Sequence, residues 1–224
     1  MKTVNRTSRV LGIAFLLQFV TSISSGMVLQ PAWLVPGNIS ESMLTIANKP
    51  WLMQMNILVD MLTALGIIFL GAMLFSTLRK QNEKIALVAF GFYIMEATLL
   101  AVSKISAFSL IHISQEYTTT GHPAYLLTMG NLALDSMNFG GSTLHMLTFC
   151  FGGILFYYLL FKSRIVPWAL SLWGLLTVFP MLIATVSELF GTLLPIYFYI
   201  LYIPFELVIG IWILVKGIKD IQEE

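Results

Sequence analysis

Polar side chains recur every three or four residues along one otherwise apolar stretch. They are Asn131, Asp135, Asn138, Ser142 and His145, and a rotation of about 100° per residue would place all five on one face of an α-helix. Acyl chains cannot solvate a carboxylate or an imidazole, and each would cost at least about 3 kcal/mol facing lipid. The spacing therefore predicts a buried polar ridge that faces other helices or water.

Ionisable residues in the other apolar segments would supply partners for this ridge. Asp60, Glu96, Lys104 and Glu206 each lie inside a hydrophobic stretch, and none lies deep in the cytoplasmic half of the topology derived below. Because charged groups inside a membrane are expensive, several of them converging favour a site rather than structural pairing alone. We expect an outward-opening pocket, with an aromatic wall. The residues predicted to line it are Asp60, Glu96, Lys104, Asp135, Asn138, Ser142, His145, Tyr199, Tyr202 and Glu206.

Composition assigns the chain to the membrane class. Of its 224 residues, 58% are hydrophobic and 10% charged, whereas soluble domains carry about 25% charge. A net charge of +1 and the lack of a long basic run argue against a nucleic-acid partner. Cys150 is the one cysteine, which excludes an internal disulfide and any cysteine-based metal cluster.

Hydropathy predicts an all-α fold, a polytopic bundle of six transmembrane helices in a single domain over residues 1–224. The first segment follows Lys2, Arg6 and Arg9 and could instead be a cleaved signal peptide. A break is expected near Gly130, and the connector from His112 to Pro123 is expected to be polar and external. The predicted spans are approximately 10–29, 51–78, 85–109, 131–161, 166–187 and 193–215.

Lysine and arginine set the predicted orientation. They cluster at both chain ends and in the turns 79–84 and 162–164, whereas the opposite side has only Lys49. Because basic residues are retained in the cytoplasm, both termini are expected there, in a multi-pass protein of the plasma membrane.

Several stretches resemble the bacterial membrane family called domain of unknown function 4386. They touch nearly the whole chain in order: SRVLGIAFLLQFV from Ser8, RKQNEKIALVAFGFYIMEATLL from Arg79, SQEY from Ser114, FYYLLFKSRIVPWALSLWGLL from Phe156 and IPFELVIGIWILVKG from Ile203. The resemblance implies a multi-span membrane protein and assigns no catalytic role. The family tends to have glutamate where this chain has Glu96 and Glu206. It often has a basic residue where Trp168 stands, and a different polar cluster in the fourth helix.

Binding or transport of a small polar or amphipathic molecule is the leading functional hypothesis. Carboxylates, Lys104 and tyrosines would suit a cationic or zwitterionic ligand, with Glu96 or Glu206 changing protonation as the ligand enters. Six helices are few for a lone transporter and no internal repeat is evident, so a homo-oligomer would make up the number.

Two alternatives stay open, and the sequence does not decide whether the protein is an enzyme. In the first, an intramembrane hydrolase acts on lipid, with His145 and two or three carboxylates binding zinc to activate water. No HExxH pair or GxSxG elbow supports it, although Ser142 precedes His145 on the same predicted face. In the second, the chain is a non-catalytic subunit or sensor whose charges pair internally.

Overall fold

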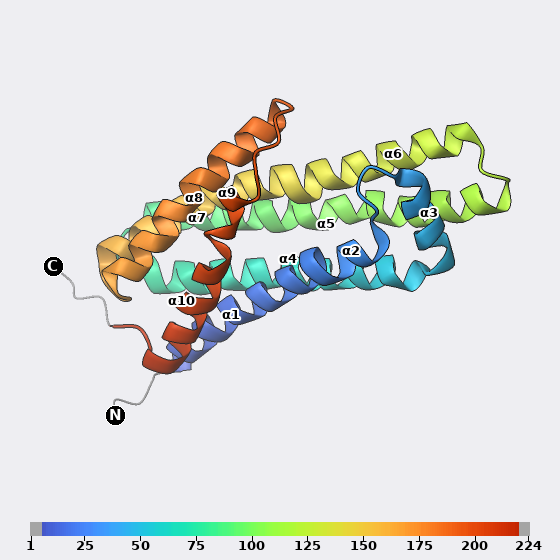
Figure 1. The fold of residues 1–224 in the computed structure, drawn as a ribbon. Helices are drawn as coiled ribbons and strands as arrows, with labels where there is room; N and C mark the ends of the chain where they lie inside the picture. Colours follow the sequence, from blue (N-terminus) through green and yellow to red (C-terminus); the bar gives the residue numbers. More distant parts are fainter. Residues whose placement is uncertain (1–5, 220–224) are drawn as a thin grey trace. The chain divides into compact units, whose positions relative to one another are not determined.

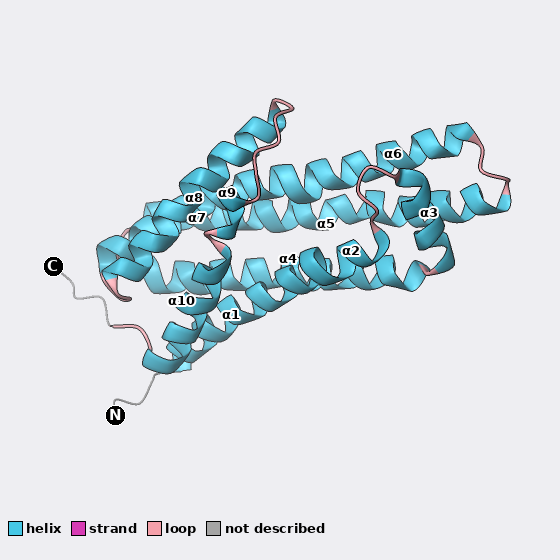
Figure 2. Cartoon of the chain, in the orientation of Figure 1, coloured by secondary structure: helices cyan, strands magenta, loops and turns pink. Residues whose placement is uncertain are grey.

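Twelve helical elements build the chain in the computed structural model, which describes residues 6–219; Lys2 lies outside them. No strand occurs within that range, and short loops join the helices (Figure 2). The elements are α1 (Arg6–Ile23), η1 (Ser24–Leu29), α2 (Gln30–Trp33), α3 (Ile39–Asn48), α4 (Pro50–Leu78), α5 (Glu83–Thr119), α6 (Ala124–Asn138), η2 (Phe139–Leu144), α7 (His145–Ser163), α8 (Trp168–Leu189), α9 (Tyr197–Ile200) and α10 (Ile203–Lys216) (Figure 1).

Six of the helical stretches are long and apolar enough to cross a membrane, which confirms the predicted count. They are Arg6–Trp33, Pro50–Leu78, Glu83–Thr119, Ala124–Ser163, Trp168–Leu189 and Tyr197–Lys216. The chain divides into two compact units, each described by itself. The terminal unit comprises Met1–Phe19, Leu65–Ala97 and His145–Glu224, and the central unit comprises Val20–Ala64 and Thr98–Leu144. The single transmembrane domain expected from the sequence stays a prediction.

Helix α5 is longer than its predicted span. It has 37 residues, about 55 Å at a rise of about 1.5 Å each, whereas a hydrocarbon core is about 30 Å thick. The expected polar connector is therefore largely wrong, because the helix continues to Thr119. Ser114 and Thr120 each donate a side-chain hydrogen bond to the carbonyl four residues earlier, at 2.6 and 2.7 Å. Leu110, Ile111 and Tyr117 in this extension are buried in the core of the central unit, and this packing holds the helix beyond its predicted span.

The predicted break near Gly130 is also wrong, because α6 runs through that residue. A Cβ on Gly130 would lie 2.4 Å from the sulfur of Met43 on α3. The glycine thus permits α3 to pack against α6 rather than ending the helix. Around this contact the central unit has an apolar core to which α2, α3, α4, α5 and α6 contribute buried side chains, among them Trp33, Met43, Met53, Leu110 and Met137.

Two π-helical segments interrupt otherwise continuous helices of the central unit. Segment η1 contains Ser24-Ser25-Gly26, and η2 contains Gly140-Gly141-Ser142. Small residues favour such local widening, since they relax the packing that holds an α-helix regular. At the end of η1, the Gln30 N–H donates to the Ser25 carbonyl five residues earlier. The expectation that Gly140-Gly141 allows bending or close contact is consistent with this geometry.

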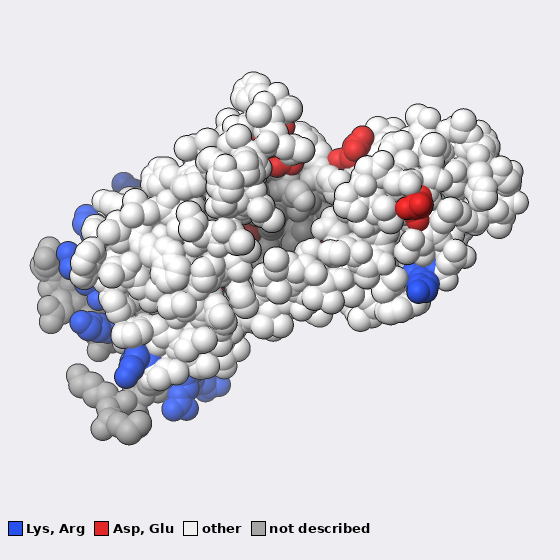
Figure 3. Space-filling view, in the orientation of Figure 1, with Lys and Arg blue, Asp and Glu red and all other residues white. Residues whose placement is uncertain are grey.

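Basic side chains gather at one end of the terminal unit (Figure 3). The segment after α10 contacts two other parts of this unit there: the Ile218 N–H donates to Ser8 Oγ at 3.2 Å, and the Lys219 N–H donates to the Ile165 carbonyl at 2.9 Å. The exposed basic residues of this unit are Arg6, Arg9, Arg79, Lys80, Lys84, Lys162, Arg164, Lys216 and Lys219.

Substitution of Gly12 by alanine tests the contact of α1 with α10 in the terminal unit. A Cβ on Gly12 would lie 2.7 Å from the backbone nitrogen of Leu214, and backbone cannot move aside as a side chain can. We expect Gly12→Ala to lower the free energy of unfolding by about 1–3 kcal/mol, measured by denaturant titration in detergent micelles. Gly91→Ala is the control, because nothing lies within 4 Å of its added Cβ. Equal stability of the two variants would contradict this contact.

Candidate functional site

A buried ion pair occupies the centre of the polar contacts in the central unit. Lys104 Nζ on α5 donates to Asp60 Oδ2 on α4 at 2.6 Å. The side chains are 11% and 10% exposed, so water screens the pair weakly. Breaking such a pair from one side leaves an uncompensated buried charge, which costs about 3–5 kcal/mol. The pair therefore fixes α4 against α5 within this unit.

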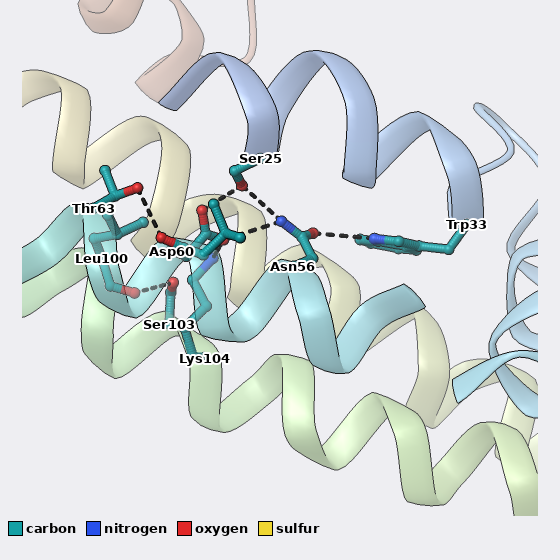
Figure 4. Close-up of polar contacts among 9 residues, drawn as sticks. Ser25, Trp33, Asn56, Asp60, Thr63, Leu100, Ser103 and Lys104 are labelled. Atoms are coloured by element: carbon teal, nitrogen blue, oxygen red, sulfur yellow. Dashed lines mark hydrogen bonds and ion pairs between the residues drawn. The ribbon is translucent and has the colours of Figure 1, made fainter. Parts of the chain in front are cut away.

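A hydrogen-bond network surrounds Asp60 (Figure 4). Ser25 Oγ donates to Asp60 Oδ1, and Asn56 Nδ2 donates to Ser25 Oγ at 2.6 Å and, more weakly, to Asp60 Oδ2 at 3.4 Å. Trp33 Nε1 donates to Asn56 Oδ1 at 3.0 Å. With Lys104, three donors thus serve the two carboxylate oxygens. These contacts hold the Asp60 carboxyl group in a fixed orientation.

Both π-helical segments contribute to this cluster. Segment η1 carries Ser25, which donates to Asp60. Segment η2 carries Gly141, where a Cβ would lie 2.5 Å from Ser103 Oγ and 3.6 Å from Lys104 Nζ. Ser103 Oγ donates to the Leu100 carbonyl at 2.7 Å. π-helical turns are rare and are frequently found at functional sites, and here two of them contribute to the surroundings of one ion pair.

Glu96 of the terminal unit lacks a complete set of partners. Glu96 is 2% exposed, and its Oε2 has no hydrogen-bond partner among the described residues. Oε1 lies 4.0 Å from His145 Nδ1, and the Glu96 backbone carbonyl lies 3.5 Å from the same nitrogen. The imidazole can therefore face the carboxyl group, while the second oxygen is left for a group that the chain does not supply.

Glu206 of the terminal unit ends a chain of hydroxyl groups. Tyr202 Oη donates to Glu206 Oε1 at 2.9 Å and lies 2.5 Å from Tyr157 Oη. Tyr157 and Tyr202 are buried. The Tyr202 hydroxyl thus links the Tyr157 hydroxyl to the Glu206 carboxyl group.

The position of Tyr202 depends on a break in the last membrane span. Helix α9 ends at Ile200 and α10 begins at Ile203, with Pro204 in its first turn. Proline lacks an N–H and so removes one donor from the helix. Trp173 Nε1 on α8 donates to the Leu201 carbonyl at the break, at 3.2 Å. The tryptophan thereby satisfies a carbonyl that the interrupted helix would otherwise leave unpaired in lipid.

The predicted ridge is wrong as a buried feature. Asn131, Asp135 and Ser142 are exposed, whereas Asn138 and His145 are half-buried. Asn131 and Asp135 lie in regular α6, whose buried face carries Ala133 and Met137 instead. Beyond them, η2 lies between α6 and α7 and changes the rotation that the ridge assumed for Ser142 and His145. Asp135 precedes Lys162 by about 27 residues, or about 40 Å of helix, so water rather than lipid can solvate it.

Contacts join some of the other predicted site residues within each unit. Asp60 contacts Lys104 in the central unit; in the terminal unit Glu96 faces His145, and Tyr202 contacts Glu206. Tyr199 lies half-buried on α9. The sequence reasoning missed Trp33 and Tyr157. Polar-tipped aromatic residues inside apolar segments are the signal that could have found them, because a buried indole or phenol needs a hydrogen-bond partner.

The metal site of the enzyme hypothesis is not supported. Within residues 6–219, no three side chains among His, Cys, Asp and Glu are grouped so that they could hold a metal ion. His145 faces a single carboxyl group, Glu96, whereas a catalytic zinc needs three protein ligands. The residues present therefore do not fit the zinc ion that this hypothesis requires.

The fold and these polar groups define a multi-pass helical membrane protein. Residues 10–217 match the model of the family described as Domain of unknown function (DUF4386). The match covers nearly all of the chain, so the chain belongs to this family. The match also confirms the resemblance found in the sequence. Neither the curated proteins nor the solved structures yield a match.

A double-mutant cycle tests the ion pair of the central unit. We expect Asp60→Asn and Lys104→Gln each to lower the free energy of unfolding by about 3–5 kcal/mol, since each leaves one buried charge uncompensated. The double variant should lose less than the sum of the two, because it leaves no charge. Glu116→Gln, at an exposed position of α5, should change stability by less than about 0.5 kcal/mol. Additive losses in the cycle would contradict a direct pairing.

Proposed function

We propose that the protein binds a small cationic or zwitterionic molecule in the terminal unit and carries it across the membrane in exchange for protons. The observation that carries this proposal is the buried carboxyl group of Glu96, whose Oε2 has no hydrogen-bond partner among the described residues. A small polar or amphipathic ligand with an ammonium group would complete its contacts.

The energetic argument starts from the cost of leaving Glu96 unmatched. An unpaired ionised carboxylate in the hydrocarbon is expensive, and a protonated one still needs an acceptor for its O–H. His145 Nδ1, at 4.0 Å from Oε1, is too distant for a good hydrogen bond. An ammonium ligand would offer both charge and donors, so Glu96 would lose its proton as the ligand arrives.

Glu206, with Tyr157 and Tyr202, would carry the protons that are exchanged for the ligand. The Tyr157, Tyr202 and Glu206 oxygens form a continuous series at 2.5 and 2.9 Å. Such a series lets a proton leave or reach Glu206 without moving a charged side chain through lipid. The electrostatic interaction of Glu96 with Glu206 would couple the charge of one to the charge of the other.

The broken span also supports a binding role. Transporters commonly place their substrate sites at discontinuous helices near the middle of the membrane. Here the break between α9 and α10 carries Tyr202, and Glu206 follows one turn later. Glu206 precedes Lys216 by about 10 residues, or about 15 Å, which is close to the midplane of a core about 30 Å thick.

The basic end of the terminal unit supports a cytoplasmic location of both termini in a plasma membrane. All of its exposed lysines and arginines lie near the chain ends or in the α4–α5 and α7–α8 turns, as the positive-inside rule requires for a cytoplasmic face. The ligand would then enter from the opposite, outer side.

Uptake into proteoliposomes tests the transport proposal. With an imposed proton gradient, we expect purified protein to accumulate ethanolamine or tyramine, a hydrophilic and an aromatic molecule that each carry a primary ammonium group. Glu96→Gln and Glu206→Gln should each reduce the initial rate at least about tenfold, because the amide cannot exchange a proton. Glu116→Gln, exposed on α5, should transport as the wild type does. Gradient-driven uptake that is unchanged in both Gln variants would refute the proposed roles of these carboxyl groups.

Cysteine labelling on intact cells tests the orientation. In a Cys150→Ser background, a membrane-impermeant maleimide should label Glu116→Cys at once, whereas Lys162→Cys should react only after permeabilisation. Both side chains are exposed, and each lies near the C-terminal end of its span. The predicted topology places those two ends on opposite sides of the membrane, because consecutive spans cross it in opposite directions. The reverse pattern would place the termini outside.

A further inference from the structure

The geometry points to a binding surface for anionic phospholipid headgroups at the basic end of the terminal unit. Its centre is a basic cluster of three exposed side chains, Arg9, Arg164 and Lys219, from three segments that are distant in the sequence. The ligand is a phospholipid with a net negative charge, from the membrane that the chain spans. Neither Glu96 nor Glu206 belongs to this surface, so lipid binding here is independent of the proposed transport.

Two hydrogen bonds bring the three segments of the basic cluster together. The Lys219 N–H donates to the Ile165 carbonyl at 2.9 Å, next to Arg164 in the α7–α8 turn. The preceding residue donates its N–H to Ser8 Oγ at 3.2 Å, one residue before Arg9 on α1. Because neighbouring Cα atoms are only about 3.8 Å apart, the segment after α10 holds the backbones of the three basic residues close together.

Exposed acidic side chains are scarce in the terminal unit. Its other exposed lysines and arginines also lie at the basic end (Figure 3), whereas Glu83 is the one exposed acid among its described residues. Asp220, Glu223 and Glu224 follow Lys219 in the sequence and lie outside the described residues, and basic residues stay in excess when these three are counted. Each basic residue near a membrane surface favours anionic lipid by about fivefold.

The α7–α8 turn places the basic cluster at the level of the headgroups. Two membrane spans end and begin on either side of Arg164, at Ser163 and Trp168. The connector 164–167, at about 3.5 Å per residue, can rise and return by only about 7 Å, which is about the thickness of one headgroup layer. Trp168 is 53% exposed, as tryptophans at the membrane interface commonly are. The Arg164 side chain therefore lies among headgroups.

Arg164 has a backbone conformation that favours glycine. Its φ is 55°, in the left-handed region that residues with a Cβ rarely adopt. Its guanidinium carbon lies 5.7 Å from the centre of the Phe161 ring, and this contact holds the charged group at the end of α7. A guanidinium group can donate two parallel hydrogen bonds to one phosphate group. The basic cluster thus combines positive charge with a positioned phosphate donor.

Spin-labelled lipids test this surface in a bilayer. The full chain is reconstituted in dioleoylphosphatidylcholine, and electron paramagnetic resonance gives the protein-bound fractions of labelled phosphatidylglycerol and labelled phosphatidylcholine. At low ionic strength, we expect phosphatidylglycerol to associate at least about fivefold more strongly, the contribution of about one basic residue. The preference should fall in about 1 M sodium chloride, where the screening length is about 3 Å. Equal association of the two lipids at low ionic strength would overturn the inference.

Two triple variants with the same change of charge separate the basic cluster from general positive charge. The cluster variant is Arg9→Gln/Arg164→Gln/Lys219→Gln. The control variant removes three charges from the turn between α4 and α5, at the same end of the unit: Arg79→Gln/Lys80→Gln/Lys84→Gln. We expect the cluster variant to lose at least about threefold more of the preference for phosphatidylglycerol than the control variant. Equal losses would show that net charge alone attracts the lipid, and the basic cluster would be rejected.

Arg164→Gly separates lipid binding from stability. Glycine adopts a φ of about 55° without strain, so this variant should have a Tm in maltoside micelles at least as high as that of the wild type. Its preference for phosphatidylglycerol should nevertheless fall at least about twofold, because the guanidinium group is gone. An unchanged preference in this folded variant would contradict the role of Arg164 in the surface.

Discussion

Charge inside a hydrocarbon layer must be matched, and the two units meet this requirement differently. In the central unit, Asp60 is matched by Lys104 and two neutral donors. In the terminal unit, Glu96 keeps one oxygen without a hydrogen bond. The first arrangement holds helices in place, because each buried charge requires its partner. In the second, a buried carboxyl oxygen lacks a partner among the described residues, and the proposed binding function rests on this oxygen.

Irregular backbone accompanies both arrangements. Segments η1 and η2 widen two helices in the central unit, and the α9–α10 break interrupts a span in the terminal unit. Each irregularity has a local cause, namely small residues in the π-helical turns and Pro204 at the break. Each also brings a polar group into place, Ser25 in one case and Tyr202 in the other. Departures from regular helix are thus tied to the polar chemistry of this protein.

The sequence was sufficient to predict the six spans, because their length and apolar composition leave few alternatives. It did not predict where α5 ends, because Leu110, Ile111 and Tyr117 beyond the predicted span are buried in the core of the central unit. The ridge failed because the buried face of α6 carries Ala133 and Met137 instead, and because η2 changes the helical rotation before His145. The pairing of Asp60 with Lys104 could not be predicted from the sequence. The sequence indicates how far along its helix each charged residue lies, but it does not indicate which neighbouring helix that residue faces.

The length of α5 has a practical consequence. The helix is about 55 Å long, so nearly half of its length exceeds a hydrocarbon core about 30 Å thick. It ends in a turn at Thr120 and Gly121, from which α6 returns within the same unit. A rigid fiducial domain grafted into this turn, or an antibody fragment raised against it, would remain outside the micelle and give a small membrane protein the mass that particle alignment in electron microscopy requires.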